Sequence, residues 1–188
     1  MSLWGASTTD ESKPKHLTDA EKRDVYATKE GWVKRTAGTG GRAGRVHEEI
    51  LVAIGDLSGG TAGTAKLAAG TISSTRFITT SLGAAAGGAF SAEVIYNEKV
   101  DVTGTPLLTV TNDTPSRNVT LSYASGTGTN RLTFTATVAA DATTVGDVLS
   151  VGADAVTAAG TIKDAGTNTD SARTHSAQAA TTNITVAA

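Results

Sequence analysis

The side chains that most often carry catalysis or bind transition metals are few in this sequence and widely separated. The chain of 188 residues contains three histidines and no cysteine, which excludes thiolate chemistry and cysteine-containing metal sites. His16, His47 and His175 follow no metal-ligand spacing, and no serine lies in a nucleophile elbow. A Ser-His-Asp triad remains an alternative, because the three residues of a triad come together in space rather than along the sequence. We therefore expect surface histidines, no catalytic residue, no cofactor and no enzyme.

Aspartates recur in the C-terminal part of the chain, within segments that are expected to be loops. These residues are Asp141, Asp147, Asp154, Asp164 and Asp170. Loop carboxylates of a β-sandwich can gather around Ca²⁺, which takes several oxygen ligands. Their spacing does not match a calcium-binding loop of the EF-hand type, and isolated loop aspartates usually stabilise turns. We predict turn residues and no metal.

A glycine-rich segment at residues 38–43 has a degenerate form of the dinucleotide-binding pattern. That function requires a strand before the glycines and a helix after them, and the flanking sequence predicts neither clearly. The segment is therefore expected to be a turn-rich loop. Basic residues surround it: Lys34, Arg35, Arg42, Arg45 and His47. Because Glu48 and Glu49 follow and the net charge is −2, we expect a protein-facing or solvated cluster and no nucleic-acid partner.

Charge is concentrated at the start of the chain. Residues 1–50 hold 9 of the 16 Lys and Arg, 8 of the 18 Asp and Glu, and both tryptophans, Trp4 and Trp32. A segment with dense mixed charge and few apolar residues buries too little surface to offset its ordering entropy. We interpret residues 1–45 as an extended arm that lies on another surface, with the tryptophans as anchors. The alternative is that the tryptophans belong to a core.

One short helix is expected within this arm. Thr18 and Glu21 have the spacing of a capping box, in which each side chain accepts a hydrogen bond from the other residue's backbone N–H. Asp19 and Glu21 also place negative charge in the first turn, where the helix dipole favours it. The pattern predicts a helix over residues 19–26 that is too short to be stable alone.

Two further segments lead into the second half of the chain. Residues 49–55 are almost entirely apolar and end at a glycine, which predicts one buried strand. Residues 55–70 consist mostly of Gly, Ala, Ser and Thr, a composition typical of a flexible linker.

From about residue 70 onward, apolar and polar residues alternate. Residues 90–96 place apolar side chains on one strand face, and residues 119–123 and 132–138 flank a glycine-containing turn, which predicts a hairpin. Weaker runs occupy residues 72–79, 148–151 and 183–186. About seven short strands at this spacing are typical of an immunoglobulin-type sandwich. We predict an all-β protein, an Ig-like antiparallel β-sandwich preceded by an extended N-terminal arm with one short helix.

Three ordered motifs in the second half resemble the bacterial Ig-like repeats of large adhesins and phage structural proteins. They occupy residues 93–106, 123–134 and 160–166. The N-terminal residues 2–5, 12–15, 21–22, 25–28 and 31–33 resemble the opening of virion structural proteins from marine T4-like tailed phages of the cyanophage type. The resemblances imply a head decoration protein on the capsid exterior, with the major capsid protein and neighbouring copies of itself as partners, and no catalytic residues.

These considerations divide the chain into three parts. Residues 1–45 are expected to form the anchoring arm, residues 46–69 a strand and linker, and residues 70–188 the Ig-like sandwich. The arm and the 49–55 strand would pack on the capsid protein or add a strand to it. The expected contact residues are Trp4, Tyr26, Trp32, Lys34, Arg35, Arg42 and Arg45.

Other classes of function stay open at this point. The protein could belong to the tail, neck or baseplate and hold a host-surface glycan through its Ig-like domain. Exposed aromatics would favour that function, but the domain's aromatics fall on the inward face of the strand pattern. A secreted adhesin fragment is disfavoured by the absence of a signal-peptide pattern at the N-terminus. No stretch has the roughly 20 apolar residues of a membrane span, so no membrane partner is expected.

Overall fold

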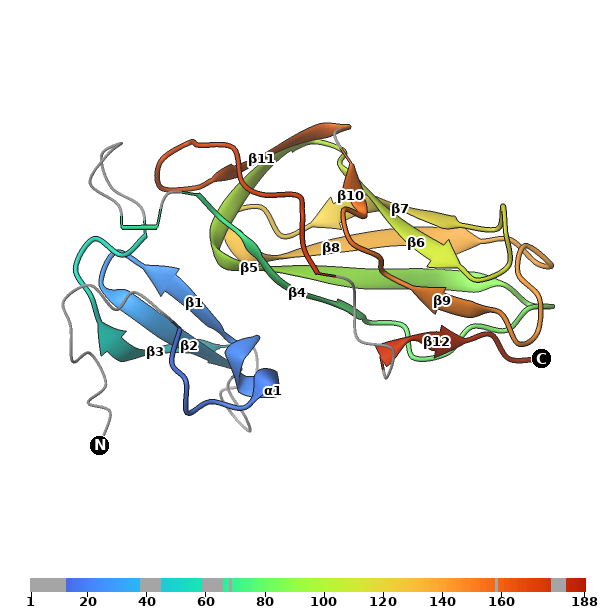
Figure 1. Cartoon of the computed structure of the whole chain (residues 1–188), viewed down its shortest axis with the longest axis horizontal. Coiled ribbons are helices and arrows are strands. Elements are labelled where there is room, and N and C mark those ends of the chain that lie inside the picture. The colour runs from blue at the N-terminus through green and yellow to red at the C-terminus, as the bar shows by residue number, and fades with distance from the viewer. Residues whose placement is uncertain (1–12, 38–44, 59–65, 68, 158, 177–181) are drawn as a thin grey trace.

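The computed structural model describes residues 13–37, 45–58, 66–67, 69–157, 159–176 and 182–188. Over these residues the chain is nearly all β and sandwich-like, which confirms the predicted fold class (Figure 1). The elements are α1 (Asp19–Lys22), β1 (Val25–Thr28), β2 (Gly31–Ala37), β3 (Val46–Ala53), β4 (Ile72–Phe77), β5 (Gly88–Gly104), β6 (Leu107–Asn112), β7 (Val119–Ser125), β8 (Thr129–Val138), β9 (Val148–Ser150), β10 (Val156–Thr157), β11 (Gly160–Asp164) and β12 (Ile184–Thr185).

The short helix α1 forms where the capping box predicts it. The Thr18 hydroxyl accepts from the Glu21 backbone N–H at 3.3 Å, and the Glu21 carboxylate accepts from the Thr18 N–H at 3.0 Å. The helix ends at Lys22, four residues before the predicted end. The helix ends early because Val25 and Tyr26 belong to strand β1, where both side chains are buried in tertiary contacts.

The N-terminal segment is folded, so the interpretation of residues 1–45 as an arm without a core is wrong for the described residues 13–37. Strands β1, β2 and β3 form an antiparallel sheet. Its core joins residues that are distant in sequence: Leu17, Val25, Ala27, Trp32 and Leu57. Because each local window contributes only one or two of these side chains, a count of apolar residues along the chain underestimates the core.

The segments after this sheet also differ from expectation. Strand β3 is mostly exposed rather than buried, because one of its edges and much of both faces meet solvent in the described structure. The expected linker contributes Leu57, which is fully buried, and Ser58, which is nearly so. Backbone N–H groups of Ile54, Asp56 and Ser58 donate to the turn at residues 28–30. The start of the linker is therefore part of the N-terminal unit.

The sandwich is organised around β5, a strand of 17 residues that bends between two sets of partners. Its first part pairs with β8 and β4, whereas its last five residues pair with β11. The register with β8 shifts between Ile95 and Val100, where the strand turns from one layer toward the other. Figure 1 shows this curl at the end of the sandwich nearest the N-terminal unit.

The predicted hairpin is confirmed as β7–β8, with Tyr123 opposite Phe134. The weaker runs become β4, β9 and β12, while β10 and β11 were not predicted as strands. The apolar faces of both layers enclose one core that includes Phe90, Leu121 and Phe134, all fully buried. The alternation of side chains therefore places the sandwich core correctly.

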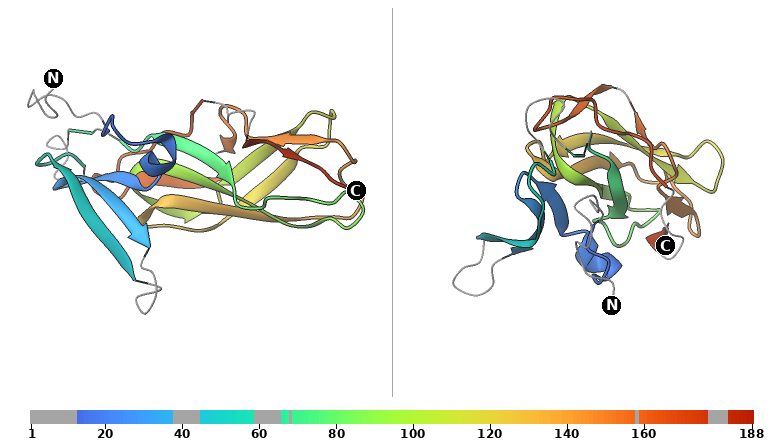
Figure 2. Two further views of the ribbon diagram at one scale, coloured as in Figure 1. Left: turned by 90° about the horizontal axis from the view of Figure 1, so that it is seen from below. Right: turned by 60° about the vertical axis from the view of Figure 1, so that its left-hand side comes forward.

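The two units meet where β1 approaches the bend of β5. Ala27 pairs with Glu98 in a parallel arrangement. The Arg131 guanidinium on β8 reaches across to the Asp24 carboxylate and donates to the Arg23 carbonyl at 3.1 Å. Figure 2 shows the N-terminal sheet at one end of the elongated sandwich, with β3 on its outer side.

Candidate functional site

Strand β3 is the terminal strand of the sheet order and the most accessible strand of the N-terminal unit. It pairs with β2 along its length, with Val46 opposite Ala37 and Ile50 opposite Val33. Within the described residues it has no second neighbour. An uncovered edge of this kind presents backbone donors and acceptors that a further strand can pair with.

The direction of the free backbone groups follows from the hydrogen bonds of β2. The Arg35 N–H donates to the Asp24 carbonyl at 2.8 Å, so the main chain of Arg35 faces away from β3. Glu48 lies opposite Arg35 and forms a pair without backbone hydrogen bonds. The N–H and C=O groups of Glu48 therefore point toward the open edge, and by alternation those of Val46 and Ile50 do the same.

The side chains of these three residues lie on one face of the sheet. Val46 is 47% exposed and Ile50 is 54% exposed, which is unusual for such large apolar side chains in a strand. Glu48 stands between them and accepts a hydrogen bond from the Tyr26 hydroxyl. We call Val46, Glu48 and Ile50, with their outward backbone groups, the β3 edge surface.

The Tyr26 hydroxyl holds the Glu48 carboxylate at the centre of the β3 edge surface through a hydrogen bond. Its ring is buried, and the Lys99 ammonium lies 5.4 Å from the ring centroid. Burial raises the pKa of Tyr26 well above its ordinary value, and the hydrogen bond to Glu48 adds to this effect. The phenol therefore stays protonated and keeps donating to Glu48.

The structure separates the residues that were predicted to form one contact surface. Tyr26 and Arg35 lie on the same face as the β3 edge surface, whereas Trp32 and Lys34 lie on the opposite face. Arg45 is exposed next to the start of β3. Two other predicted contacts, Trp4 and Arg42, lie outside the described residues.

Two of these side chains cannot act as exposed anchors in the described conformation, so the prediction is corrected for them. Trp32 is 3% exposed and packs in the N-terminal core with the Lys13 ammonium 5.5 Å from its ring centroid. Tyr26 is equally inaccessible. Lys34 pairs with Glu21 at 3.1 Å and is about a quarter exposed. The open alternative, that the tryptophan belongs to a core, is correct for Trp32.

Sequence reasoning missed Val46 and Ile50. The apolar run 50–54 suggested burial, and the polar residues 47–49 obscured the alternation that places Val46, Glu48 and Ile50 on one face. A period-two pattern of apolar, acidic and apolar residues was the available signal.

A second notable feature is Glu98, which is fully buried where β1 meets β5. Neither carboxylate oxygen has a hydrogen-bond partner among the described residues. Burial, with the nearby Asp164 carboxylate as a smaller cause, raises the pKa of Glu98 to about 7, although the nearby Ser58 hydroxyl, which falls short of hydrogen-bond geometry, lowers it. Ser58 and Asp164 also line a neighbouring pocket of about 300 Å³. We therefore expect this junction to respond to pH.

The loop aspartates act in turns, as predicted, where the structure shows their bonds. Asp147 accepts from the Asn112 side chain, the Thr114 hydroxyl and the Thr144 N–H, and these bonds lower its pKa. Asp164 accepts from the Gly166 N–H and the Thr167 hydroxyl. In the part of the chain that the structure describes, no three His, Asp or Glu side chains gather in a way that could hold a metal ion.

Comparison with protein-family models, with curated proteins and with solved structures finds no match for this chain. Among the described residues, no helix is long and apolar enough to cross a membrane.

Proposed function

We propose that this protein is a structural component that attaches to a larger protein assembly by adding a partner strand at the β3 edge surface. The observation that carries the proposal is the coincidence of outward backbone groups with two exposed apolar side chains on the same residues, Val46 and Ile50. Strand addition obtains affinity from backbone hydrogen bonds and specificity from alternate side chains. The β3 edge surface offers both.

The resemblance of the N-terminal sequence to phage head proteins suggests which assembly this is. The partner would be the major capsid protein, and the protein would decorate the capsid exterior with its sandwich facing outward. On a lattice with many copies, each site needs only modest affinity. The lack of a catalytic constellation in the sequence agrees with a structural role.

The chemistry of the β3 edge surface describes the strand that fits it. Apolar side chains on the partner would cover Val46 and Ile50, and a lysine or arginine opposite Glu48 would complete the charge pairing. Antiparallel pairing of two β3 strands is less suitable, because placing Val46 of one copy opposite Ile50 of another brings two Glu48 carboxylates together. The edge therefore favours a different protein as its partner, and neighbouring copies would touch through other surfaces.

A glycan-binding role at the tail or neck receives no support from the surface of the sandwich. Phe90, Tyr96 and Phe134 are fully buried, and Phe77 and Tyr123 are at least partly covered. A glycan site would require an exposed aromatic platform, which the described part of the sandwich does not provide.

The proposal is tested by placing positive charge on the edge. Val46→Lys with Ile50→Lys should reduce the number of copies retained on purified capsids by tenfold or more, because each buried aliphatic side chain contributes roughly 1.5–3 kcal/mol. Copies per particle are counted by quantitative gel analysis after sedimentation. The sandwich residues Ile78 and Val145 are 44% and 58% exposed, so Ile78→Lys with Val145→Lys is the matched control.

Retention of the control protein at the wild-type level, together with loss of the edge variant, supports attachment through β3. Equal retention of both variants contradicts it. A saturated copy number in the hundreds per particle places the protein on the head, whereas about a dozen or fewer places it on the tail or neck and overturns the decoration role.

A further inference from the structure

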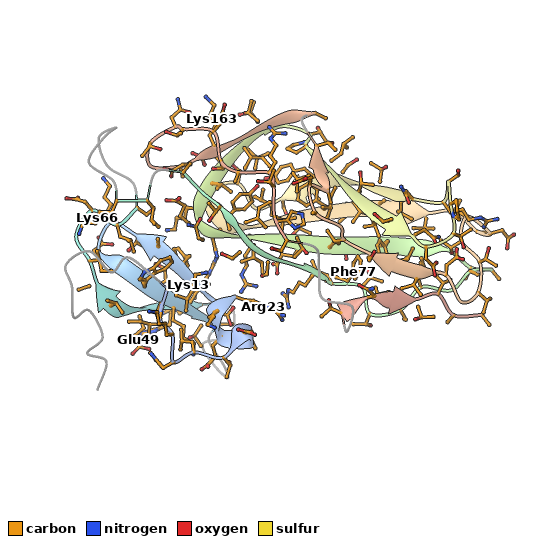
Figure 3. The ribbon with its side chains drawn as sticks, viewed as in Figure 1. Lys13, Arg23, Glu49, Lys66, Phe77 and Lys163 are labelled. Carbon is orange, nitrogen blue, oxygen red and sulfur yellow. The ribbon has the colours of Figure 1, made fainter. Side chains whose placement is uncertain are left out.

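A pocket of about 240 Å³ lies between α1 and β4, at the junction of the two units. Its volume is far above the roughly 10–15 Å³ that one water molecule requires. The lining residues are Lys13, Asp19, Lys22, Arg23, Ser73 and Ser74. Figure 3 shows Arg23 between α1 and the sandwich, with Lys13 nearby on the N-terminal unit.

The charges around this pocket are not balanced. Three of the lining residues are cationic, and Asp19 is the one acid among them. Asp19 pairs with Lys22 at 3.0 Å, and its side chain is 93% exposed. Lys13 and Arg23 form no salt bridge with any described carboxylate. Among the described residues, the lining of the pocket therefore carries more positive than negative charge.

The position of Lys13 makes this excess charge unfavourable in the empty pocket. Its ammonium donates to the Lys22 carbonyl at 3.3 Å and to the Ser73 hydroxyl at 3.2 Å. Burial, and after it the charge of Lys22, lower the pKa of Lys13 to about 8. An anion in the pocket would relieve both effects, since it supplies the missing opposite charge.

Hydroxyl groups on β4 complete the set of donors. Ser73 and Ser74 both line the pocket, and the Ser74 hydroxyl is buried with no hydrogen-bond partner among the described residues. The Ser73 hydroxyl already accepts from the Lys13 ammonium, so its own proton is free to be donated. Lys13 and Arg23 of the N-terminal unit and the Ser73 hydroxyl of the sandwich thus border one space.

We propose that this pocket binds a tetrahedral oxyanion, sulfate or phosphate, either free or carried as an ester on a larger molecule. The Lys13 ammonium and the Arg23 guanidinium supply the charge, and Ser73 supplies a neutral donor from the sandwich. Charge-assisted hydrogen bonds of this kind are about twice as strong as neutral ones. Because donors come from both units, the bound anion holds the N-terminal unit against β4.

The test uses the full chain and sulfate, whose charge does not change above pH 3. Sodium sulfate is titrated against sodium chloride at constant ionic strength, and binding is followed by calorimetry and by the thermal midpoint, which rises when a ligand binds the folded state. We expect saturable sulfate binding that Lys13→Gln and Arg23→Gln each weaken by about tenfold. Lys66→Gln makes the same charge change on an exposed residue outside the pocket and should bind sulfate as the wild type does.

A pH series adds a readout that general charge screening does not produce. Sulfate affinity should fall as the pH rises through 8, because Lys13 loses its proton, and Lys13→Arg should remove this decline. The charged groups that line the pocket with Lys13 are Lys22 and Asp19 on α1 and Arg23, which directly follows α1.

The source of the anion is distinguished by comparing inorganic sulfate with glucose 6-sulfate. Tighter binding of the ester assigns the site to a sulfated or phosphorylated polymer, and tighter binding of the inorganic ion assigns it to the free anion. The absence of saturable binding to either probe overturns the proposal. Equal weakening by Lys66→Gln and Lys13→Gln overturns it as well. The thermal midpoints in chloride show whether Lys13→Gln is still folded, and Arg23→Gln gives an independent second variant.

Discussion

Glu98 places a carboxyl group in the buried junction between β1 and β5. A fully buried carboxyl without a hydrogen-bond partner is unfavourable in its charged form, and burial raises its pKa from the ordinary 4.5 to about 7. Between these values the folded protein binds a proton that the unfolded chain does not. The free energy of unfolding therefore decreases as the pH rises from about 4.5 to 7, and it stays lower above pH 7.

Replacing this acid should remove that dependence. Glu98→Gln should increase the free energy of unfolding by about 1–3 kcal/mol at pH 8 and by little at pH 4.5. Urea denaturation at both pH values measures the difference. Glu49→Gln, on the exposed strand β3, is the control and should change stability by less than about 0.5 kcal/mol at either pH. A wild-type pH profile that Glu98→Gln leaves unchanged contradicts this role for Glu98.

At the scale of single elements, α1 depends on its cap, because four residues are too few for a helix to be stable alone. Thr18 and Glu21 satisfy each other's backbone N–H groups, and Glu21 also pairs with Lys34 on β2. The bonds from Thr18 and Lys34 lower the pKa of Glu21 to about 2. The cap thus ties the helix to the N-terminal sheet as well as starting it.

Removing the capping hydroxyl tests this connection. Thr18→Ala should destabilise the N-terminal unit by about 1 kcal/mol and speed hydrogen exchange at the amides of α1 and β1. The sandwich amides should exchange as in the wild type. Thr120→Ala, an exposed threonine on β7, serves as the control for loss of a hydroxyl. Unchanged exchange in α1 would contradict a stabilising cap.

At the scale of the whole molecule, Arg131 connects the two units. Its guanidinium lies between Glu93 on β5, at 3.3 Å, and the Asp24 carboxylate that precedes β1. It also donates to the Arg23 carbonyl. Because the described contact between β1 and β5 pairs a single residue on each strand, these bonds contribute much of the orientation of the N-terminal sheet.

Arg131→Gln should loosen this orientation while both units stay folded. We expect faster hydrogen exchange at residues 24–28 and a lower thermal midpoint, with unchanged exchange in β7. Arg76 also pairs with Glu93, at 2.7 Å, but does not reach the N-terminal unit, so Arg76→Gln is the matched control. An equal effect of the two variants on residues 24–28 would contradict the connecting role of Arg131.

Because residues 1–45 include strands β1 and β2, their deletion would remove more than an arm and would expose Leu57 and strand β3. Loss of capsid binding by that truncation would therefore not distinguish unfolding from loss of a contact. The point substitutions at Val46 and Ile50 leave the sheet intact and avoid this ambiguity.

Features that depend on short-range patterns could be predicted correctly from the sequence. The capping box at Thr18 predicts the start of a helix, and the alternation along residues 119–138 predicts a hairpin. Both predictions hold because residues close together in the sequence form these structures. The turn role of Asp164 is local in the same sense, because it accepts from Gly166 and Thr167. The all-β, sandwich-like class follows from the sum of such patterns.

Which side chains of the N-terminal unit are buried depends on contacts between segments that are distant in sequence. Trp32 is buried because Leu17, Val25 and Leu57 converge on it from three separate segments. Ile50 is exposed because β3 is the last strand of the sheet, and no short sequence pattern shows that position. The excess positive charge at Lys13 and Arg23 likewise arises only when α1 packs near β4. Burial and electrostatic environment depend on which distant segments meet, and that information is not contained in any short stretch of the chain.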